Sequence, residues 1–188
     1  MIRKDFKFKK LKNFLTLEEI ALLKDYVIIR NRINEYPPKS DEVSQEPNFY
    51  MYGDAVFDSL MLQKRKRVEE ETGLKLLPTY SYFRMYTQYS SLKKHSDRPS
   101  CEISVTALID SDGTEWPIYM DGNPVYLEPG EAAIYLGAEV EHWRDEFKGD
   151  YASQVFMHYV DRDGSHTDYY KDKRDLYGTK ALIKASTL

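Results

Sequence analysis

The feature that most constrains the fold of this chain is a series of short apolar segments beyond residue 78, separated by turn residues. Seven or so such segments follow one another, roughly ten residues apart. Within 101–109, apolar residues alternate with Ser104 and Thr106, which is the period of a β-strand. The sequences at 110–113 and 121–124 are typical of turns. This regular spacing predicts a β-sandwich or barrel.

Two helices are predicted ahead of the strands. Thr16 and Glu19 form a capping box, and apolar residues at helical spacing extend a first helix over residues 17–31. The Gly-Asp pair at 53–54 introduces a second helix, which Gly73 ends in the left-handed conformation. We therefore expect a mainly β (α+β) chain in which two N-terminal helices brace the outside of one sheet.

The pattern is that of a single domain covering residues 1–188. We expect an N-terminal helical support over 1–77, a β core over 78–162 and a polar tail over 163–188, with a short helical turn near Lys171–Leu176. The breaker-rich and polar segment 34–53 is predicted to be a loop, and it is a candidate lid over a site in the β core.

Composition restricts the possible partners. A formal net charge of −4 gives no electrostatic reason to expect nucleic-acid binding. No window has the apolar length of a membrane span, and the N-terminus lacks the apolar run of a signal peptide. The single cysteine, Cys101, suits a reducing compartment, so we expect a cytoplasmic protein. The 16 tyrosines are typical of half-buried sheets or aromatic-lined clefts.

Two imidazoles and one carboxylate stand at the ends of predicted strands. His95 and Asp97 form a His-x-Asp pair just after the aromatic run at 80–86, and a later apolar segment ends at His142. Because residues i and i+2 project to the same side of extended backbone, His95 and Asp97 can bind one metal ion together. Two histidines and one carboxylate form the facial triad of non-haem iron(II) sites. The sequence therefore predicts such a site if folding brings His142 alongside.

A longer set of motifs surrounds these three residues. In chain order it comprises Tyr86, Leu92, His95-x-Asp97, residues 127–135, Gly137 and His142. This ordered set resembles the iron(II)/2-oxoglutarate-dependent dioxygenase superfamily, above all its prolyl-4-hydroxylase-like branch and small relatives from phages and marine bacteria. The resemblance covers roughly residues 78–162, together with the helix entry at 13–19.

The resemblance implies a double-stranded β-helix, or jelly roll, with iron(II) held by His95, Asp97 and His142. It also implies 2-oxoglutarate as cosubstrate and O2 as oxidant, with succinate and CO2 as products and hydroxylation of a C–H bond. The substrate would be a small molecule or a peptide, with a prolyl or other amino-acid side chain as the target. The oligomeric state is left open.

One part of the family pattern is missing. The family usually places an Arg or Lys nine to twelve residues beyond the distal histidine, where it pairs with the far carboxylate of 2-oxoglutarate. The corresponding window, 151–154, contains no cation. Arg144 and Arg84 are the candidate substitutes, and Tyr86 matches a tyrosine that contacts the cosubstrate in prolyl-hydroxylase relatives. Gln154 could donate a neutral hydrogen bond. We favour Arg144 together with Tyr86.

Three alternatives remain open from the sequence. Because of the missing cation, the chain could be a cupin-type metal oxygenase that does not use 2-oxoglutarate. It could also be a non-catalytic jelly-roll binding module in which the triad is coincidental. His158 is the one rival to His142 as a ligand, although a hydrogen-bonded core histidine is the more economical interpretation.

Overall fold

The computed structural model describes residues 6–33 and 48–178. Its helices are α1 (Leu17–Ile33) and α2 (Ala55–Thr72), with short 3-10 helices η1 (Pro99–Cys101) and η2 (Thr167–Lys173). Its strands are β1 (Phe8–Leu11), β2 (Phe49–Tyr52), β3 (Leu76–Thr87), β4 (Leu92–His95), β5 (Ile103–Ser111), β6 (Ile118–Met120), β7 (Asn123–Val125), β8 (Ala132–Leu136), β9 (His142–Arg144) and β10 (Tyr151–Asp161).

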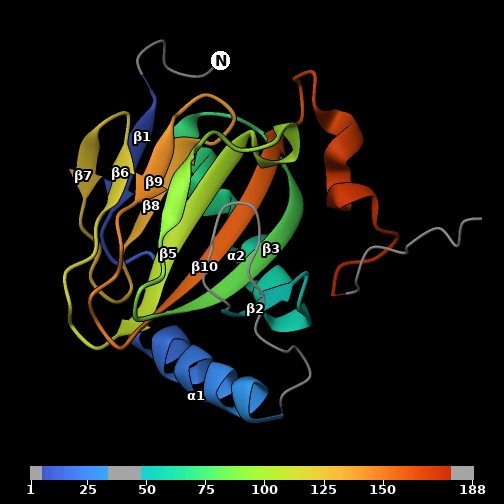
Figure 1. The fold of residues 1–188 in the computed structure, drawn as a ribbon. Helices are drawn as coiled ribbons and strands as arrows, with labels where there is room; N and C mark the ends of the chain where they lie inside the picture. The colour runs from blue at the N-terminus through green and yellow to red at the C-terminus, as the bar shows by residue number, and fades with distance from the viewer. Residues whose placement is uncertain (1–5, 34–47, 179–188) are drawn as a thin grey trace, which may run out of the picture.

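The strands form two antiparallel sheets, as Figure 1 shows. The large sheet has the order β1-β8-β5-β10-β3-β2, and the small sheet has the order β4-β9-β6-β7. Chain neighbours are therefore rarely sheet neighbours, because the chain repeatedly crosses from one sheet to the other. This arrangement is the predicted double-stranded β-helix, and the mainly β fold class with two N-terminal helices is confirmed.

Both helices begin where the sequence predicts, and α2 also ends there, whereas α1 runs beyond its predicted end at residue 31 to Ile33. At the start of α1, the Thr16 N–H donates to the Glu19 carboxylate and the Glu19 N–H donates back to Thr16 Oγ1. Asp54 caps α2 by accepting from the Val56 N–H, and Gly73 ends it with a φ of 76°. None of the helices in the described ranges is both long and apolar enough to span a membrane.

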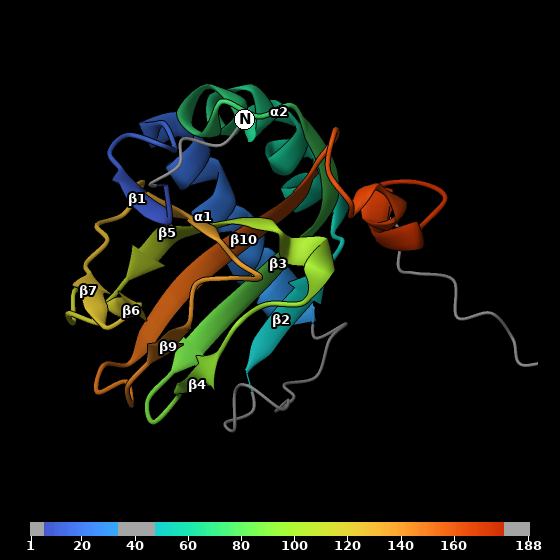
Figure 2. The same ribbon diagram turned by 90° about the horizontal axis from the view of Figure 1, so that it is seen from above.

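The helices cover the outer face of the large sheet, and the small sheet lies over the other face (Figure 2). Strand β5 is accordingly buried on both faces through Ile109. Ile103 and Val105 pack in the same apolar cluster as Phe57 and Met61 of α2. The alternate residues of β5, which include Ser104, point to the opposite side, between the two sheets.

The strand register determines what lines the space between the sheets. Arg84 of β3 lies opposite Gln154 of β10, and Tyr82 lies opposite Phe156. Residues directly opposite one another in an antiparallel pair share a face of the sheet. The inner face of β3 and β10 is therefore unusually rich in aromatic and polar side chains for the interior of a domain.

Among the described strands, β1, β2 and β4 lie where the sequence predicts none. β1 pairs with β8, and β2 adds an edge strand beside β3. The predicted loop at 34–53 therefore ends before Phe49, while its portion 34–47 lies outside the described residues. Ring contacts across the pair explain why this polar-looking segment joins the sheet, since Tyr50 stacks on Tyr82 at 5.6 Å between centroids.

Pro78 lies inside β3 and does not bound it, because the strand already begins at Leu76. Proline has no N–H to donate to the ladder and is tolerated where the pairing is irregular. Pro78 lies opposite Tyr159, beside the register shift between Met157 and Tyr159 of β10. The irregularity in β10 thus accommodates the proline.

The tail also differs from its prediction. The helical turn expected near Lys171–Leu176 lies earlier, within η2 (Thr167–Lys173), whose residues 170–172 have non-helical backbone angles. Arg174, directly after this turn, forms a buried ion pair with Asp58 of α2, with 2.8 Å between Nη1 and Oδ2. That pair holds the segment after η2 against α2 and β3.

Candidate metal centre

His95, Asp97 and His142 lie at adjoining ends of two paired strands in the small sheet. His95 is the last residue of β4 and His142 the first of β9, and the two are direct partners across the pair. The expectation that a strand ends at His142 is wrong. The chain turns after β8, where the Val140 N–H donates to the Leu136 carbonyl, and a new strand begins at the histidine.

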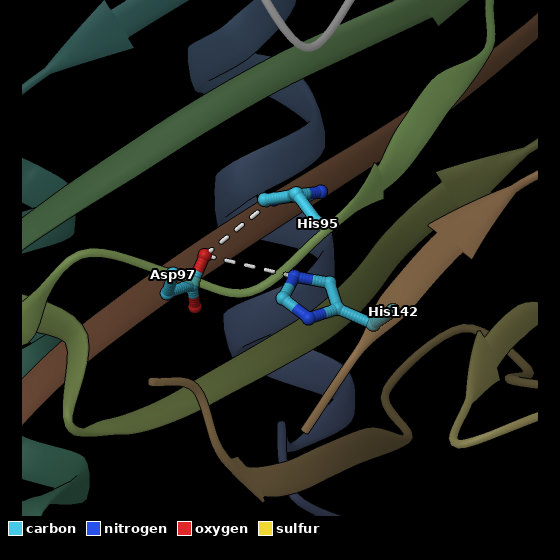
Figure 3. A group of neighbouring side chains, drawn as sticks. All are labelled: His95, Asp97 and His142. Atoms are coloured by element: carbon cyan, nitrogen blue, oxygen red, sulfur yellow. Dashed lines mark ion pairs between the residues drawn. The ribbon is translucent and has the colours of Figure 1, made fainter. Parts of the chain in front are cut away.

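The potential ligand atoms of the three side chains face one another, as Figure 3 shows. Nε2 of His95 and Nε2 of His142 each lie 3.6 Å from Asp97 Oδ1. All three ligand atoms lie within 4.8 Å of one another. Atoms that bind one metal ion at right angles from about 2.1 Å are about 3 Å apart. A small contraction of this group would therefore enclose an ion.

Backbone contacts fix both imidazoles in the form that binds a metal. Nδ1 of His95 is 2.7 Å from the Lys93 carbonyl oxygen, and Nδ1 of His142 is 2.9 Å from the Val140 carbonyl oxygen. A carbonyl can only accept, so both Nδ1 atoms carry the proton. Each Nε2 therefore keeps a lone pair, which is directed towards Asp97. Metal-binding histidines usually donate their other ring N–H to a carbonyl or carboxylate in this way.

The Asp97 carboxylate is held from two sides. Its main-chain N–H donates to the Gly137 carbonyl over 2.8 Å, and its Oδ2 accepts from Ser104 Oγ over 2.9 Å. A Cβ on Gly137 would lie 2.5 Å from Asp97 Oδ2 and 2.2 Å from the Cys101 carbonyl oxygen. Glycine is therefore required at 137 for the carboxylate to occupy this place.

The protonation states suit metal binding. Burial alone would raise the pKa of the Asp97 carboxyl, but its contacts with His95 and Ser104 and the neighbouring imidazoles hold that pKa below its ordinary value. Burial lowers the pKa of His142, which favours the neutral ring. At neutral pH Asp97 is therefore a carboxylate and His142 a neutral imidazole, and together with the His95 ring they form a donor set that fits iron(II).

The triad opens into a pocket of about 230 Å³ between the two sheets. Five aromatic side chains line it: Tyr80, Tyr82, Tyr86, Tyr135 and Phe156. The tyrosine-rich composition thus corresponds to an aromatic-lined cleft. A pocket on one side of the three ligand atoms leaves space for further ligands of the metal and for a substrate.

Arg144 is a buried cation with unused hydrogen-bonding capacity. It is 3% exposed, its Nη1 donates to the Trp116 carbonyl over 2.6 Å, and its guanidinium lies 4.6 Å from the Trp116 ring centroid. Within residues 6–33 and 48–178, its Nε and Nη2 have no hydrogen-bond partner. Burial lowers its pKa to about 10, so it stays charged at neutral pH. Such a group is suited to an anion.

The other candidate cosubstrate residues separate into two groups. Tyr86 is fully buried, its ring lies 4.8 Å from that of Trp116, and it lines the pocket of the triad together with Arg84. The Nη2 of Arg84 donates to the Tyr82 hydroxyl over 2.8 Å. Gln154 instead lines a neighbouring pocket of about 250 Å³. The structure thus brings Tyr86 and Arg84, but not Gln154, into one pocket with the triad.

His158, the rival ligand, lies just beneath the triad. Its Nδ1 is 2.9 Å from Ser104 Oγ, and its ring is 4.5 Å from that of Tyr80. It is therefore a buried, hydrogen-bonded histidine that also borders the pocket.

Sequence reasoning missed Ser104 as a residue of the site, and it placed Gly137 in the ordered set of motifs without giving it a role. The sequence does contain a pattern that could have indicated Ser104. Residues 103, 105, 107 and 109 form a wholly apolar face of the strand, and Ser104 is a polar residue on the opposite face. Gly137 directly follows β8. The need for glycine at this position comes from its contact with Asp97, which the sequence alone does not reveal.

No protein-family model matches this sequence, and no curated protein matches it significantly. Solved structures with the same fold do match. A prolyl-4-hydroxylase from Pseudomonas putida has a TM-score of 0.64 at 17% identity, covering 84% of this chain and 94% of that one. HygX from Streptomyces hygroscopicus, with nickel and 2-oxoglutarate bound, has a TM-score of 0.67 at 10% identity, covering 86% and 85%.

A viral collagen prolyl hydroxylase from Paramecium Bursaria Chlorella virus-1, in complex with 2-oxoglutarate, has a TM-score of 0.61 at 9% identity. The match covers 82% of this chain and 96% of that one. A likeness to small phage and marine bacterial relatives in particular stays a prediction. The chain has the double-stranded β-helix fold of the iron(II)- and 2-oxoglutarate-dependent oxygenases.

Proposed function

We propose that this protein is a non-haem iron(II)- and 2-oxoglutarate-dependent oxygenase whose metal ligands are His95, Asp97 and His142. The observation that carries the proposal is the convergence of two imidazole Nε2 atoms on one Asp97 oxygen, 3.6 Å from each, at the edge of a pocket. Both rings are fixed by backbone carbonyls in the tautomer that a metal requires.

The division of work between the protein and its cofactors follows from this arrangement. When bound, iron(II) with 2-oxoglutarate and O2 supplies the oxidising chemistry, in which one oxygen atom enters succinate and the other becomes the new hydroxyl of the substrate. The chain would hold the metal through three side chains and orient the cosubstrate in a pocket lined by aromatic rings.

Arg144 is the residue we propose for the far carboxylate of 2-oxoglutarate, with Tyr86 beside it. Among the described residues the buried guanidinium has no partner for its Nε and Nη2 groups, and a carboxylate would satisfy both with charge-assisted hydrogen bonds. A buried cation without a counter-ion destabilises the folded protein, so Arg144 is best explained if an anion binds to it. This supports a 2-oxoglutarate enzyme over a cupin-type oxygenase. Arg144 itself is not among the residues that line the triad's pocket; it packs on Trp116, whose ring lies against Tyr86. We assign Arg84 to the wall of the triad's pocket.

The substrate is proposed to be a small molecule or a peptide, hydroxylated on a prolyl or other amino-acid side chain. Support comes from the fold shared with the Pseudomonas putida prolyl-4-hydroxylase and from the tyrosines of the pocket, which offer apolar faces to a ring or an aliphatic side chain.

Thermal unfolding tests this assignment without a substrate. A ligand that binds only the folded state raises Tm in proportion to the logarithm of its concentration. We expect Ni(II) to raise the Tm of the wild-type protein and 2-oxoglutarate to raise it further only when the metal is present. His142→Ala should lose both shifts. Stabilisation by the metal but not by 2-oxoglutarate would favour the cupin-type alternative, and no stabilisation by either would favour a non-catalytic module.

A further inference from the structure

A buried hydrogen-bonded group lies directly beneath the proposed metal-binding carboxylate. Asp97 Oδ1 faces the two ligand imidazoles, whereas Oδ2 accepts a 2.9 Å hydrogen bond from Ser104 Oγ. Ser104 Oγ lies 2.9 Å from Nδ1 of His158. Ser104 is fully buried and His158 is 5% exposed, so water does not compete for these contacts.

The direction of these hydrogen bonds can be assigned. The Ser104 hydroxyl has one proton, and its acceptors are Asp97 Oδ2 and the Cys101 carbonyl oxygen at 3.1 Å. The charged carboxylate is the stronger acceptor. Ser104 Oγ then accepts from the Nδ1–H of His158. Burial lowers the pKa of His158 to about 4, so its ring is neutral and this is its one N–H.

The same atoms do not make a second metal site. Asp97, Cys101 and His158 offer ligand atoms within 4.8 Å of one another. A metal there would need the Cys101 thiolate, but burial raises the pKa of that thiol to about 12, and its sulfur lies 3.1 Å from the Tyr80 hydroxyl. The group is therefore better explained as a support for the carboxylate.

We propose that Ser104 and His158 are positioning residues that restrict Asp97 to binding the metal through one oxygen. This inference rests on the proposed function. A carboxylate with both oxygens free can bind a metal through both and occupy an extra position. Because Ser104 engages Oδ2 and Gly137 packs against it, only Oδ1 is offered to the metal. An iron(II) ion held through one atom of each of the three side chains would keep open positions for the cosubstrate and O2.

The test measures 2-oxoglutarate binding to the Co(II)-loaded full-length protein, followed through the visible absorption of the cobalt ion. Ser104→Ala removes the donor to Oδ2. His158→Asn keeps an N–H near the position of Nδ1, whereas His158→Gln moves it towards the position of Nε2. Ser153→Ala, a buried serine on β10 outside the group, is the matched control.

We expect S104A and H158Q to bind 2-oxoglutarate roughly 10- to 100-fold more weakly than wild type, with altered Co(II) absorption before its addition. H158N and S153A should stay close to wild type. Cosubstrate binding in S104A equal to wild type would overturn the inference, and so would H158N as weak as H158Q. The comparison of H158N with H158Q tests the inference even if S104A does not fold. A wild-type protein that binds no Co(II) would overturn the proposed function itself.

Discussion

The main-chain N–H of Asp97 donates to the carbonyl oxygen of Gly137 over 2.8 Å, and the Gly137 Cα packs against the Asp97 carboxylate. The loop that carries the candidate metal ligand is thus tied to the turn after β8. Gly137 has its own N–H bonded to the Glu102 carbonyl, which links the start of β5 to the same turn. Three segments distant in sequence therefore fix the position of one carboxylate.

Gly137→Ala should abolish metal-dependent stabilisation. The added Cβ would meet the Cys101 carbonyl oxygen at 2.2 Å and Asp97 Oδ2 at 2.5 Å, so the carboxylate or the backbone must move. The measurement is the Tm with and without Ni(II). Gly164→Ala is the control, because its Cβ would approach only Asp161 in its own turn, at 3.0 Å. A Ni(II) shift of wild-type size in G137A would contradict the packing described.

Arg144→Met should weaken 2-oxoglutarate binding while leaving metal binding intact. Loss of one partner of a buried charge pair costs about 2–5 kcal/mol, which is about 30-fold or more in affinity. Calorimetric titration of the metal-loaded protein measures this. Lys94→Met is the control, since Lys94 is an exposed cation close to the site that pairs with Glu141. If R144M and K94M bind the cosubstrate equally well, Arg144 is not its partner.

The same R144M variant should be more stable than wild type when no ligand is present. In the part of the chain that the structure describes, two nitrogen atoms of the guanidinium have no hydrogen-bond partner. Replacing buried charge with a well-packed apolar side chain typically stabilises by about 1–4 kcal/mol. Urea unfolding of the metal-free proteins gives the free energy of unfolding. A less stable R144M would mean that its hydrogen bond to Trp116 outweighs the buried charge.

Asp58→Asn should destabilise the protein by about 3–5 kcal/mol, because Arg174 would be left as a buried charge without its counter-ion. Both side chains are almost completely buried, and the carboxylate also accepts from the Ser81 hydroxyl at 2.7 Å and the Gly178 N–H at 2.8 Å. Urea unfolding measures the change. The exposed pair of Lys7 and Asp121 provides the comparison.

Asp121→Asn should change the free energy of unfolding by less than about 1 kcal/mol, as is usual for solvent-exposed ion pairs. Equal effects of D58N and D121N would show that the Arg174 pair does not hold the segment after η2 in place.

Stability should fall with rising pH above about 10, partly through Tyr159. Burial raises the pKa of Tyr159 well above its ordinary value near 10, and its hydroxyl donates to the Met61 carbonyl over 2.8 Å. Below pH 10 the native and unfolded states both keep the proton, so this contribution is constant. Above it the unfolded chain loses the proton while the native state keeps it, so stability falls by up to about 1.4 kcal/mol per pH unit.

Tyr159→Phe should therefore show a smaller loss of stability between pH 9 and pH 11 than wild type, measured by urea unfolding. Tyr126→Phe, a change at an exposed tyrosine, should follow the wild-type profile. Parallel profiles for Y159F and wild type would show that the Tyr159 hydroxyl does not titrate on unfolding.

Local chemistry explains which features the sequence could predict. The helix ends follow from Thr16, Glu19 and Gly73, whose effects reach only one turn of backbone. His95 and Asp97 are two residues apart, and so are His142 and Arg144. In extended backbone the two members of each pair point to the same side. These predictions need no knowledge of distant contacts.

The features that could not be predicted depend on register between distant strands. Gln154 was a candidate cosubstrate residue, but only the pairing of β10 places it at a neighbouring pocket. Ser104 and His158 meet across β5 and β10, which have a register shift between Ser153 and Gln154. A one-residue slip would turn either side chain to the opposite face, so no local pattern could have joined them.

The measurement that tests the central assignment most directly is anaerobic addition of iron(II) and then 2-oxoglutarate, followed by visible absorption. A keto acid that chelates iron(II) gives a weak charge-transfer band. We expect this band in the wild-type protein and its loss in His142→Ala. Iron binding without the band would contradict the use of 2-oxoglutarate, and a protein that binds no iron(II) would contradict the assignment of His95, Asp97 and His142 as a metal centre.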